Sequence, residues 1–198
     1  KRRWRSCAST DPDAPADHRR RDDGEREGGD RDTVLELRGL RPNREYWYRF
    51  RVGKQVSETG RTRTAPAPGE RVRDLRFAFA SCQDFQAGHY TAYPHMIDED
   101  VAFVAFLGDY IYENTPNPAA PRLHEGTGEA IRLTDYRNRH GQYRTDPDLR
   151  KAHSSVPWIV TLDDHELDNN WADESPQDPA RQAPEAFRAR RTAAFRAY

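Results

Sequence analysis

The chain has 198 residues, which is enough for one domain or for one domain and part of a second. Its 32 Lys and Arg residues nearly balance its 33 Asp and Glu residues, and the net charge of −1 offers neither a basic surface for nucleic acid nor a polybasic membrane anchor. No apolar run approaches the ~18 residues that a membrane span needs, and there is no signal-peptide pattern. The two cysteines, Cys7 and Cys82, do not form a disulfide framework, so they leave the redox compartment undecided.

Residues 1–31 form a highly charged segment with almost no large apolar side chains. The stretch DPDAPADHRRRDDGEREGGDRD mixes opposite charges densely. Such a segment cannot bury enough apolar surface to offset the entropy of ordering its backbone. We therefore expect residues 1–31 to be a poorly ordered tail.

Residues 32–66 show the period-two alternation that is typical of half-buried β-strands. The apolar members of two alternating runs are Val34, Leu35 and Leu37, then Tyr46, Tyr48, Phe50 and Val52. RPNRE predicts a turn between these runs, VGKQVS predicts a second hairpin, and RTRTAPAPG predicts a last strand that enters a linker at 67–72. The pattern resembles the final strands of an immunoglobulin-like or fibronectin-like sandwich. A whole sandwich needs about 100 residues, so only its C-terminal part is expected here.

Residues 73–198 alternate between apolar runs and helical patterns. The apolar runs are VRDLRFAFASC, VAFVAFLGDY and VPWIVTLDDHE, and HYTAYPHMIDED predicts a short helix after the first of them. Residues 133–155 carry helix signals, with Thr134 and Thr145 as expected N-caps. Apolar runs separated by helices indicate an α/β sheet that is at least partly parallel and buried on both faces.

The last segment, PEAFRARRTAAFRAY, predicts an amphipathic helix. Its expected apolar face comprises Phe187, Ala194, Phe195 and Tyr198. Because the sequence provides nothing after this helix for that face to pack on, and because it begins at Lys1, we expect a fragment. The fragment would hold only the N-terminal half of the α/β domain.

Each of the three apolar runs ends in potential metal ligands. The first ends at Cys82, the second at Asp109 and Tyr112 within GDYIY, and the third at Asp164 and His165 within LDDHE. Ligands bind at the carboxyl ends of strands in open α/β sheets, so these side chains are expected to meet in one crevice. A mixture of thiolate, carboxylate and phenolate favours a hard, higher-valent ion over a structural zinc site.

Each of these residues has a simpler explanation when it is taken alone. An isolated Cys82 would more often be a buried structural cysteine, Asp109 could cap a turn, and Tyr112 could be a packed aromatic. Asp164 is favoured as a ligand over Asp163, which can cap the turn. The helical stretch RNRHGQYR, residues 137–144, is most simply a solvated face. Four other polar residues are expected to bond local backbone or to lie on the surface: Asp84, His89, His95 and Glu113.

Several long motifs follow one another in order: FAFASCQDFQAGHYTAYPHM, VAFVAFLGDYIYE, YRNRHGQYRTDPDLRKAHSSVPWIVTLDDHELDNNW and RRTAAFRAY. Together they resemble the alkaline phosphatase D (PhoD-like) family of metallophosphatases. The preceding GLRPNREYWYRFRVGKQVSETGRTRTAP is similar to that family's N-terminal fibronectin-like domain. The implied fold is the N-terminal half of a metallophosphatase-like α/β sandwich. The family usually has Trp where this chain has Leu162, and it completes its site with histidine- and aspartate-bearing segments further downstream.

The resemblance implies a role for each residue at the strand ends. Cys82 and Tyr112 would bind a ferric ion, and Asp109 would bridge that ion to a neighbouring calcium ion. Asp164 would bind the calcium ion. His165 would assist catalysis at the phosphate.

Arg137, in YRNRH, is a looser candidate for a catalytic contact with the phosphate. Zinc or manganese stays open as an alternative to iron and calcium. The implied activity is hydrolysis of a phosphate mono- or diester, in which the metals polarise the phosphoryl oxygens and lower the pKa of a water. The resemblance also implies a secreted, periplasmic or cell-surface protein exported by the twin-arginine route, and we expect a monomer. The alternative is a non-catalytic remnant whose β-domain binds a partner.

Overall fold

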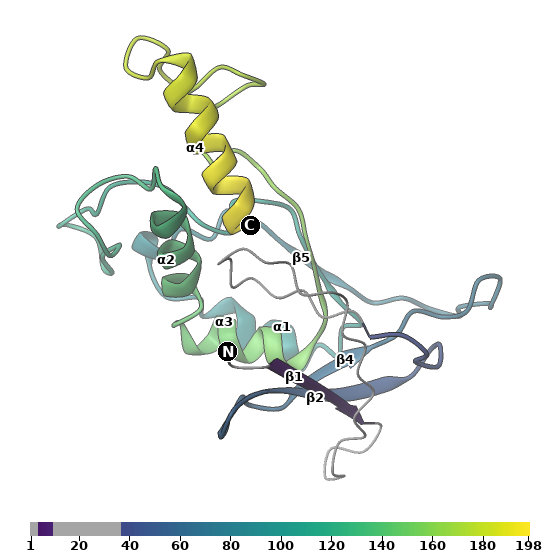
Figure 1. Cartoon of the computed structure of the whole chain (residues 1–198). Coiled ribbons are helices and arrows are strands. Elements are labelled where there is room, and N and C mark those ends of the chain that lie inside the picture. The colour runs from purple at the N-terminus through teal and green to yellow at the C-terminus, as the bar shows by residue number, and fades with distance from the viewer. Residues whose placement is uncertain (1–3, 10–36) are drawn as a thin grey trace. The chain divides into compact units, whose positions relative to one another are not determined.

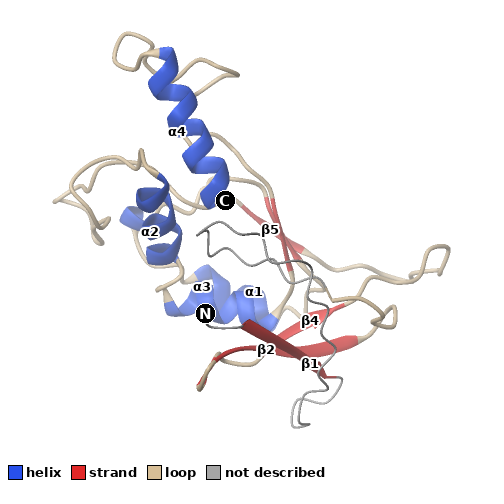
Figure 2. Ribbon diagram, in the orientation of Figure 1, coloured by secondary structure: helices blue, strands red, loops and turns tan. Residues whose placement is uncertain are grey.

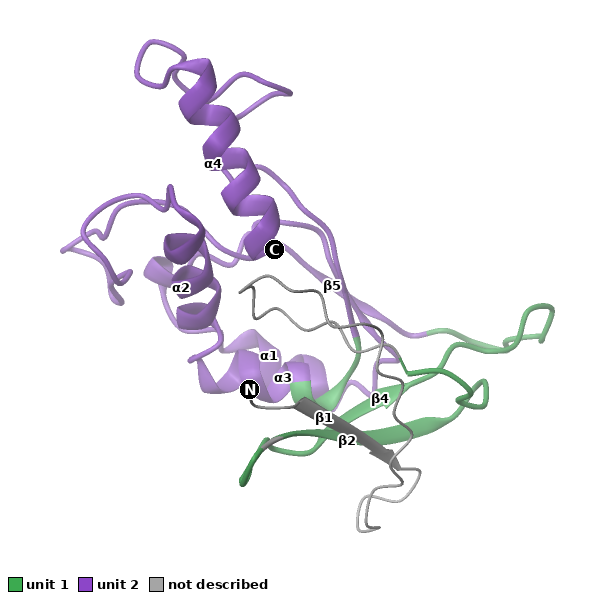
Figure 3. Cartoon of the chain, viewed as in Figure 1, with its two compact units in different colours: residues 1–75, 154–157 green, residues 76–153, 158–198 purple. Residues whose placement is uncertain are grey.

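The structure is a computed structural model that describes residues 4–9 and 37–198 (Figure 1). The chain divides into two compact units, which Figure 3 distinguishes by colour. Unit 1 comprises residues 1–75 and 154–157, and unit 2 comprises residues 76–153 and 158–198. Unit 1 contributes an antiparallel sheet, whereas unit 2 combines a parallel sheet with helices.

Unit 1 is organised around strand β2, Glu45–Val52. Strand β1, Trp4–Ser9, pairs antiparallel with β2 along the whole of β1. Strands β3, Gln55–Val56, and β4, Gly60–Arg63, also pair antiparallel with β2. Gly53, with φ of 62°, provides the left-handed residue for the tight β2–β3 turn. The predicted strand at β2, the hairpin at VGKQVS and the last strand before the linker are confirmed.

Two predictions for the N-terminal region fall largely outside the described residues. Trp4–Ser9 form β1, a strand that the charge pattern of residues 1–31 does not indicate. The rest of that predicted tail lies outside the described residues, as do Val34 and Leu35 of the first alternating run. Leu37, the last residue of the run, precedes β2 without belonging to a strand.

Unit 2 contains a parallel sheet of three short strands, and Figure 2 colours strands red and helices blue. The strands are β5, Ala78–Ala80; β6, Val104–Phe106; and β7, Trp158–Val160. They lie in chain order, with Phe79, Ala105 and Ile159 in register. The predicted α/β arrangement with parallel strands is confirmed. The loops that follow the three strands therefore leave the same edge of the sheet.

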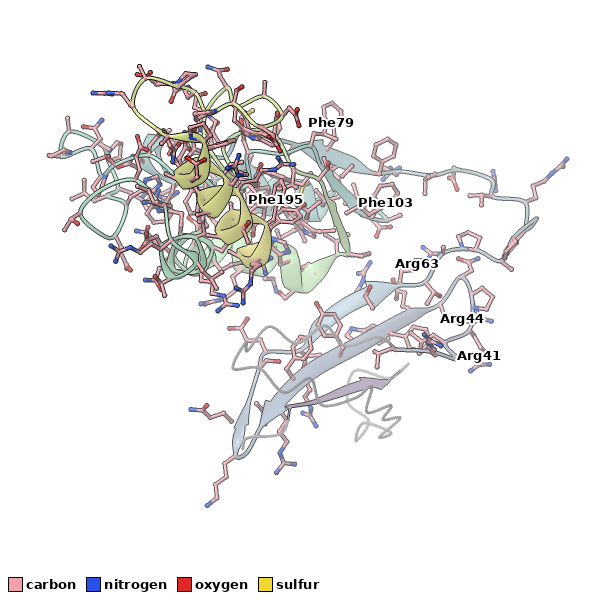
Figure 4. All side chains as sticks on the ribbon, turned by 45° about the horizontal axis from the view of Figure 1, so that its top comes forward. Arg41, Arg44, Arg63, Phe79, Phe103 and Phe195 are labelled. Atoms are coloured by element: carbon pink, nitrogen blue, oxygen red, sulfur yellow. The ribbon has the colours of Figure 1, made fainter. Side chains whose placement is uncertain are left out.

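The two faces of this sheet differ in burial. Val104 and Phe106 are fully buried, and Phe106 packs with Trp158 in the core of unit 2. On the opposite face Phe79 is 71% exposed and Ile159 is 62% exposed, and Figure 4 shows Phe79 projecting from the strands. The prediction of burial on both faces is therefore wrong for the described residues, because the core side chains contributed by the helices pack on one face.

The predicted short helix is α1, Ala92–Asp98. Residues 133–155 form two helices, of which the first is α2, Leu133–Tyr143. Thr134 lies inside α2, and the N-cap is Arg132, whose backbone N–H donates to the Asp135 carboxylate over 2.8 Å. The prediction of Thr134 as an N-cap is therefore wrong, because the acidic residue in the first turn bonds the backbone in its place.

The second of these helices is α3, Pro147–Ser155. Asp146 Oδ1 accepts the backbone N–H groups of Asp148 and Leu149, each over 3.0 Å, which is the hydrogen-bond pattern of an N-cap. Thr145 instead donates its hydroxyl to the carbonyl of Gln142 near the end of α2. The cap thus lies one residue beyond the predicted position, at the aspartate that directly precedes a proline at the first helical position.

The C-terminal helix is α4, Pro184–Ala197, and it packs against α2. The expectation that this apolar face has nothing to pack on is wrong for Phe187 and Ala194, which are buried, whereas Phe195 and Tyr198 are exposed by 41% and 47%. Arg190 is buried in their place. None of the helices among the described residues combines the length and apolar character needed to cross a bilayer.

Candidate metal centre

The loops after β5 and β6 continue side by side beyond the sheet. The Cys82 N–H donates to the Gly108 carbonyl over 3.2 Å, and the Gln83 N–H donates to the Asp109 carbonyl over 3.1 Å. Cys82 and Asp109 both have left-handed backbone conformations, with φ of 57° and 55°. This conformation is uncommon outside glycine, although aspartate adopts it more readily than most residues. Two predicted ligands therefore occupy sharply turned positions in adjacent loops.

The loop after β7 is tied to the loop after β6 by Glu166. This side chain is 1% exposed, and its carboxylate accepts the backbone N–H groups of Asp109 over 3.2 Å, Asp163 over 2.7 Å, and Tyr110. Burial raises the pKa of Glu166, and the three backbone hydrogen bonds oppose that rise. One buried carboxylate thus holds two ligand-bearing loops in a fixed relation.

Gly108 allows these two loops to approach closely. Its φ is 106°, and a Cβ added to it would lie 2.3 Å from the Asp163 Cβ and 2.7 Å from the Asp163 backbone nitrogen. A side chain at this position would therefore meet backbone that Glu166 already holds in place. The glycine of the GDYIY motif is required by this approach as well as by its conformation.

We expect Gly108→Ala to destabilise the protein by about 3 kcal/mol or more, because it combines an overpacked contact with a strained backbone conformation. The control is Gly141→Ala on α2, where nothing lies within 4 Å of the new Cβ, and which should stabilise by about 0.5–1 kcal/mol. Urea unfolding of both variants measures the difference. Equal unfolding midpoints for the two variants would contradict this reading of the contact.

Asp109, Asp164 and His165 form a cluster at the ends of β6 and β7. Their possible ligand atoms all lie within 4.8 Å of one another, with Asp109 buried and the other two half-buried. Asp109 Oδ1 accepts the backbone N–H of His165 over 3.3 Å, and Asp164 Oδ2 accepts the backbone N–H of Asn170. The structure therefore brings together three residues that the sequence places at two separate strand ends.

Tyr112 contacts this cluster through Asp109, whereas Cys82 is exposed beside it and is not among the ligand atoms that lie within 4.8 Å of one another. The Tyr112 hydroxyl donates to Asp109 Oδ2 over 3.3 Å. Burial raises the pKa of Asp109, the Asp164 charge raises it further, and hydrogen bonds from the Cys82 thiol and the His165 backbone lower it. The pKa of Tyr112 is also raised, first by burial and then by the negative charge of Asp109. Crowded groups that each resist carrying negative charge are stabilised by a bound cation, so the donor set fits a metal ion.

His165 is held by Glu113, a residue that sequence reasoning assigns to local backbone or to the surface. That assignment is wrong for Glu113, which is 1% exposed and accepts from His165 Nδ1 over 2.8 Å and from the Asn169 N–H over 2.8 Å. The Tyr112 ring stacks on the imidazole, with centroids 4.0 Å apart. Burial alone lowers the pKa of His165, but the hydrogen bond and charge of Glu113, with Asp109, raise it above its ordinary value. The only signal in the sequence is that Glu113 directly follows GDYIY.

The other polar residues near the motifs lie largely where the sequence predicts them. Asp84 caps a short 3₁₀ helix, η1, Phe85–Ala87, by accepting the Gln86 N–H over 2.9 Å. His89 and His95 are exposed. Asp163 is exposed and enters the site only through its backbone N–H, whereas Asp164 belongs to the cluster.

The stretch predicted as a solvated helix face is partly buried. Arg137 lies half-buried on α2, and its contact with the phosphate stays a prediction. In contrast, Arg139, Gln142 and Tyr143 are buried on the same helix. The solvated-face prediction is therefore wrong for these three, because their polar atoms bond backbone groups of Tyr112, Asn114 and Glu125 in the segment between β6 and α2.

Comparison with known proteins identifies the family of the chain. The PhoD-like phosphatase family model matches residues 77–198, and the model of the PhoD-like phosphatase N-terminal domain matches residues 6–66. Alkaline phosphatase D of Bacillus subtilis (strain 168) is 50% identical over 169 residues, which cover 83% of this chain and 28% of that protein. A solved structure described as "Structure of PhoD" has a TM-score of 0.76 and 50% identity, over 81% of this chain and 31% of its own. The chain spans less than a third of either relative, and by its motifs, fold and family match it belongs to the PhoD-like phosphatase family.

Proposed function

We propose that the full-length protein hydrolyses phosphate esters at the cluster of Asp109, Asp164 and His165, with Cys82 and Tyr112 as further metal ligands. The observation that carries the proposal is that the loops after β6 and β7 bring Asp109, Asp164 and His165 within reach of one ion, while the loop after β5, which bears Cys82, runs beside the loop after β6. Family membership and the alkaline phosphatase D relative support the same reaction class.

The side chains combine a thiol, a phenol and carboxylates, which supports a site for two different metal ions. Cys82, Tyr112 and Asp109 would hold a ferric ion, and Asp109 with Asp164 would hold a calcium ion, which prefers oxygen ligands. Zinc or manganese is the alternative. The bound metals would supply Lewis acidity toward a phosphoryl oxygen and would make a water acidic enough to act as nucleophile.

His165 is proposed to act on the phosphate group as a proton donor or charge stabiliser. Because its Nδ1 is engaged by Glu113, its Nε2 is the ring nitrogen that can meet a substrate. A protonated Nε2 would stabilise charge on the phosphate or donate a proton to the leaving alkoxide. The Tyr112 ring stacks on one face of the imidazole. Arg137 is proposed as a further phosphate contact from α2.

The test uses the full-length protein. Elemental analysis should find iron and calcium, and the protein should hydrolyse p-nitrophenyl phosphate, its bis-ester, or both, which separates monoester from diester preference. A visible tyrosinate-to-iron absorption band should disappear in Tyr112→Phe but persist in Tyr198→Phe, a change at a half-exposed tyrosine. Absence of bound metal together with absence of hydrolysis would instead favour a non-catalytic binding module.

We also propose that residues 32–66 belong to a fibronectin-like β-domain, on the support of the antiparallel sheet around β2 and of the match to the family's N-terminal domain. Residues 67–72 then serve as a linker, and residues 73–198 as the N-terminal part of the phosphatase domain. Export by the twin-arginine route, which the family resemblance implies, and a monomeric state complete the proposal.

A further inference from the structure

The Tyr143 hydroxyl lies between two of the loops that carry predicted metal ligands. Tyr143 is fully buried at the end of α2. Its oxygen accepts the backbone N–H of Phe85 over 3.2 Å and the backbone N–H of Tyr112 over 3.0 Å. Phe85 follows Cys82 by three residues, so one side-chain oxygen bonds the loop after β5 and the loop after β6 at once.

The same hydroxyl has a third partner, His124, whose Nε2 lies 3.1 Å away. A phenol offers one proton and two lone pairs, and the two backbone N–H groups use both lone pairs. The hydroxyl proton must therefore go to His124 Nε2, which is an acceptor only in a neutral imidazole. Burial, followed by the charge of Arg139, lowers the pKa of His124 to about 4 and so favours that neutral form.

Of the two contacts of His124 Nδ1, the one with Asn114 agrees with this placement of the protons and the one with Arg139 opposes it. With Nε2 as acceptor, His124 Nδ1 carries the ring proton and donates to the Asn114 carbonyl over 3.0 Å. Arg139 Nη1 lies 2.8 Å from Nδ1, and Nδ1 could accept a hydrogen bond from it only without a proton of its own. The ring proton would then be on Nε2 and would point at the Tyr143 oxygen, whose two lone pairs are already in use. Arg139 instead donates to the carbonyls of Tyr112 and Asn114. Both backbone groups of Tyr112, its N–H and its carbonyl, are therefore held by side chains of α2.

We propose that Tyr143 is a positioning residue for the metal centre, which sets the separation between the loop of Cys82 and the loop of Tyr112 so that thiolate and phenolate can reach one ion. The proposal rests on the proposed function for the identity of that ion. The hydrogen bonds from the Phe85 and Tyr112 N–H groups to the Tyr143 hydroxyl are present in the metal-free protein. Tyr143 acts through backbone N–H groups, so it needs no contact with substrate or metal.

The chain offers a matched control in Tyr136, which is also fully buried on α2. The Tyr136 hydroxyl donates to the Leu167 carbonyl over 2.6 Å and accepts from Arg190 Nε over 2.9 Å, so it serves the loop after β7 instead. Tyr143→Phe and Tyr136→Phe each remove one buried hydroxyl from the same helix. A general loss of packing or stability affects both variants alike.

The experiment compares both variants in the full-length protein, with two readouts. In metal-free protein, amide hydrogen exchange should accelerate about tenfold or more at Phe85 and Tyr112 in Tyr143→Phe, but not in Tyr136→Phe. Titration with ferric ion should show a roughly 10- to 100-fold weaker affinity for Tyr143→Phe only, which is the usual range for residues that orient metal ligands. His124→Leu, which removes the proton acceptor but keeps the hydroxyl, should give a smaller effect of the same kind and replaces Tyr143→Phe if that variant does not fold.

Unchanged exchange at Phe85 and Tyr112 in Tyr143→Phe would overturn the proposal, and so would an equal loss of iron affinity in Tyr136→Phe. The two readouts also separate this inference from the proposed function. If the wild-type protein bound neither iron nor zinc nor manganese, the proposed metal centre would fail, and the positioning role would fail with it even if hydrogen exchange showed that Tyr143 joins the two loops.

Discussion

Asp109→Asn should abolish metal binding and lower phosphate-ester hydrolysis by a factor on the order of 10³ or more. Lewis-acid stabilisation by a metal contributes several kcal/mol, and each ~1.4 kcal/mol is a factor of ten in rate. Asparagine keeps the shape of the side chain, tolerates the left-handed conformation and can still accept the His165 N–H. The substitution therefore removes the charge that a bridging ligand needs and keeps the hydrogen bond from the His165 N–H, while the Tyr112 hydroxyl loses its acceptor at Oδ2.

The metal-free form of this variant should be at least as stable as the metal-free wild type. Because burial raises the pKa of Asp109 in the folded state, its ionised form opposes folding at pH values above that pKa. The asparagine of the variant has no charge to bury, so the opposing contribution disappears. Elemental analysis, hydrolysis of p-nitrophenyl phosphate and urea unfolding together measure the effect. Asp98→Asn, at an exposed aspartate on α1, is the control, and full metal content in Asp109→Asn would refute the assignment of this ligand.

Glu113→Ala should lower kcat by about 10- to 100-fold, the range found when a partner that orients a catalytic or metal-bound histidine is removed. The change deletes the acceptor for His165 Nδ1 and for the Asn169 N–H, so the imidazole loses its fixed orientation. Glu113→Gln keeps an acceptor without the charge, so its loss of kcat should be smaller. Glu125→Ala, at an exposed glutamate, should leave kcat unchanged.

The pKa of His165 provides an independent readout in metal-free protein. In the wild type the hydrogen bond and charge of Glu113 raise that pKa despite burial, so in both Glu113 variants it should fall. The wild-type pair stabilises the fold below the pKa of the unfolded imidazole, and this contribution is lost as the pH rises through the higher folded pKa. An NMR titration of His165, together with urea unfolding across that range, tests both statements. An unchanged pKa in Glu113→Ala would show that the pair does not control the imidazole.

The elements that periodicity and turn chemistry determine locally could be predicted from the sequence. The alternation through β2, the apolar runs of β5, β6 and β7, and the helical spacing of α4 each carry their own signal within a few residues. The rule that the carboxyl ends of parallel strands meet at one edge was then enough to predict that Asp109, Asp164 and His165 lie together. Their roles as ligands and acid stay predictions.

The parts that could not be predicted depend on partners far apart in the sequence. Glu113 meets His165 across 52 residues, and Asp109 meets Glu166 across 57. Neither glutamate differs locally from a surface residue, so only the folded arrangement shows that both are buried and bonded. The same holds for Arg190, which in the sequence resembles the other arginines of α4 and is instead paired with Asp168 over 3.0 Å.

Cys82 and Asp109 both have left-handed backbone conformations, so the residue type that suits the fold differs from the residue type that can bind a metal at these two positions. Such a conformation costs about 1 kcal/mol or more for a residue with a Cβ, and cysteine lacks the local hydrogen bonding that eases it for aspartate. Glycine at either position would therefore favour the folded chain while removing a ligand. Selection for thermal stability alone should therefore enrich glycine or asparagine at positions 82 and 109. Cysteine should persist at position 82 only in proteins that use its thiolate.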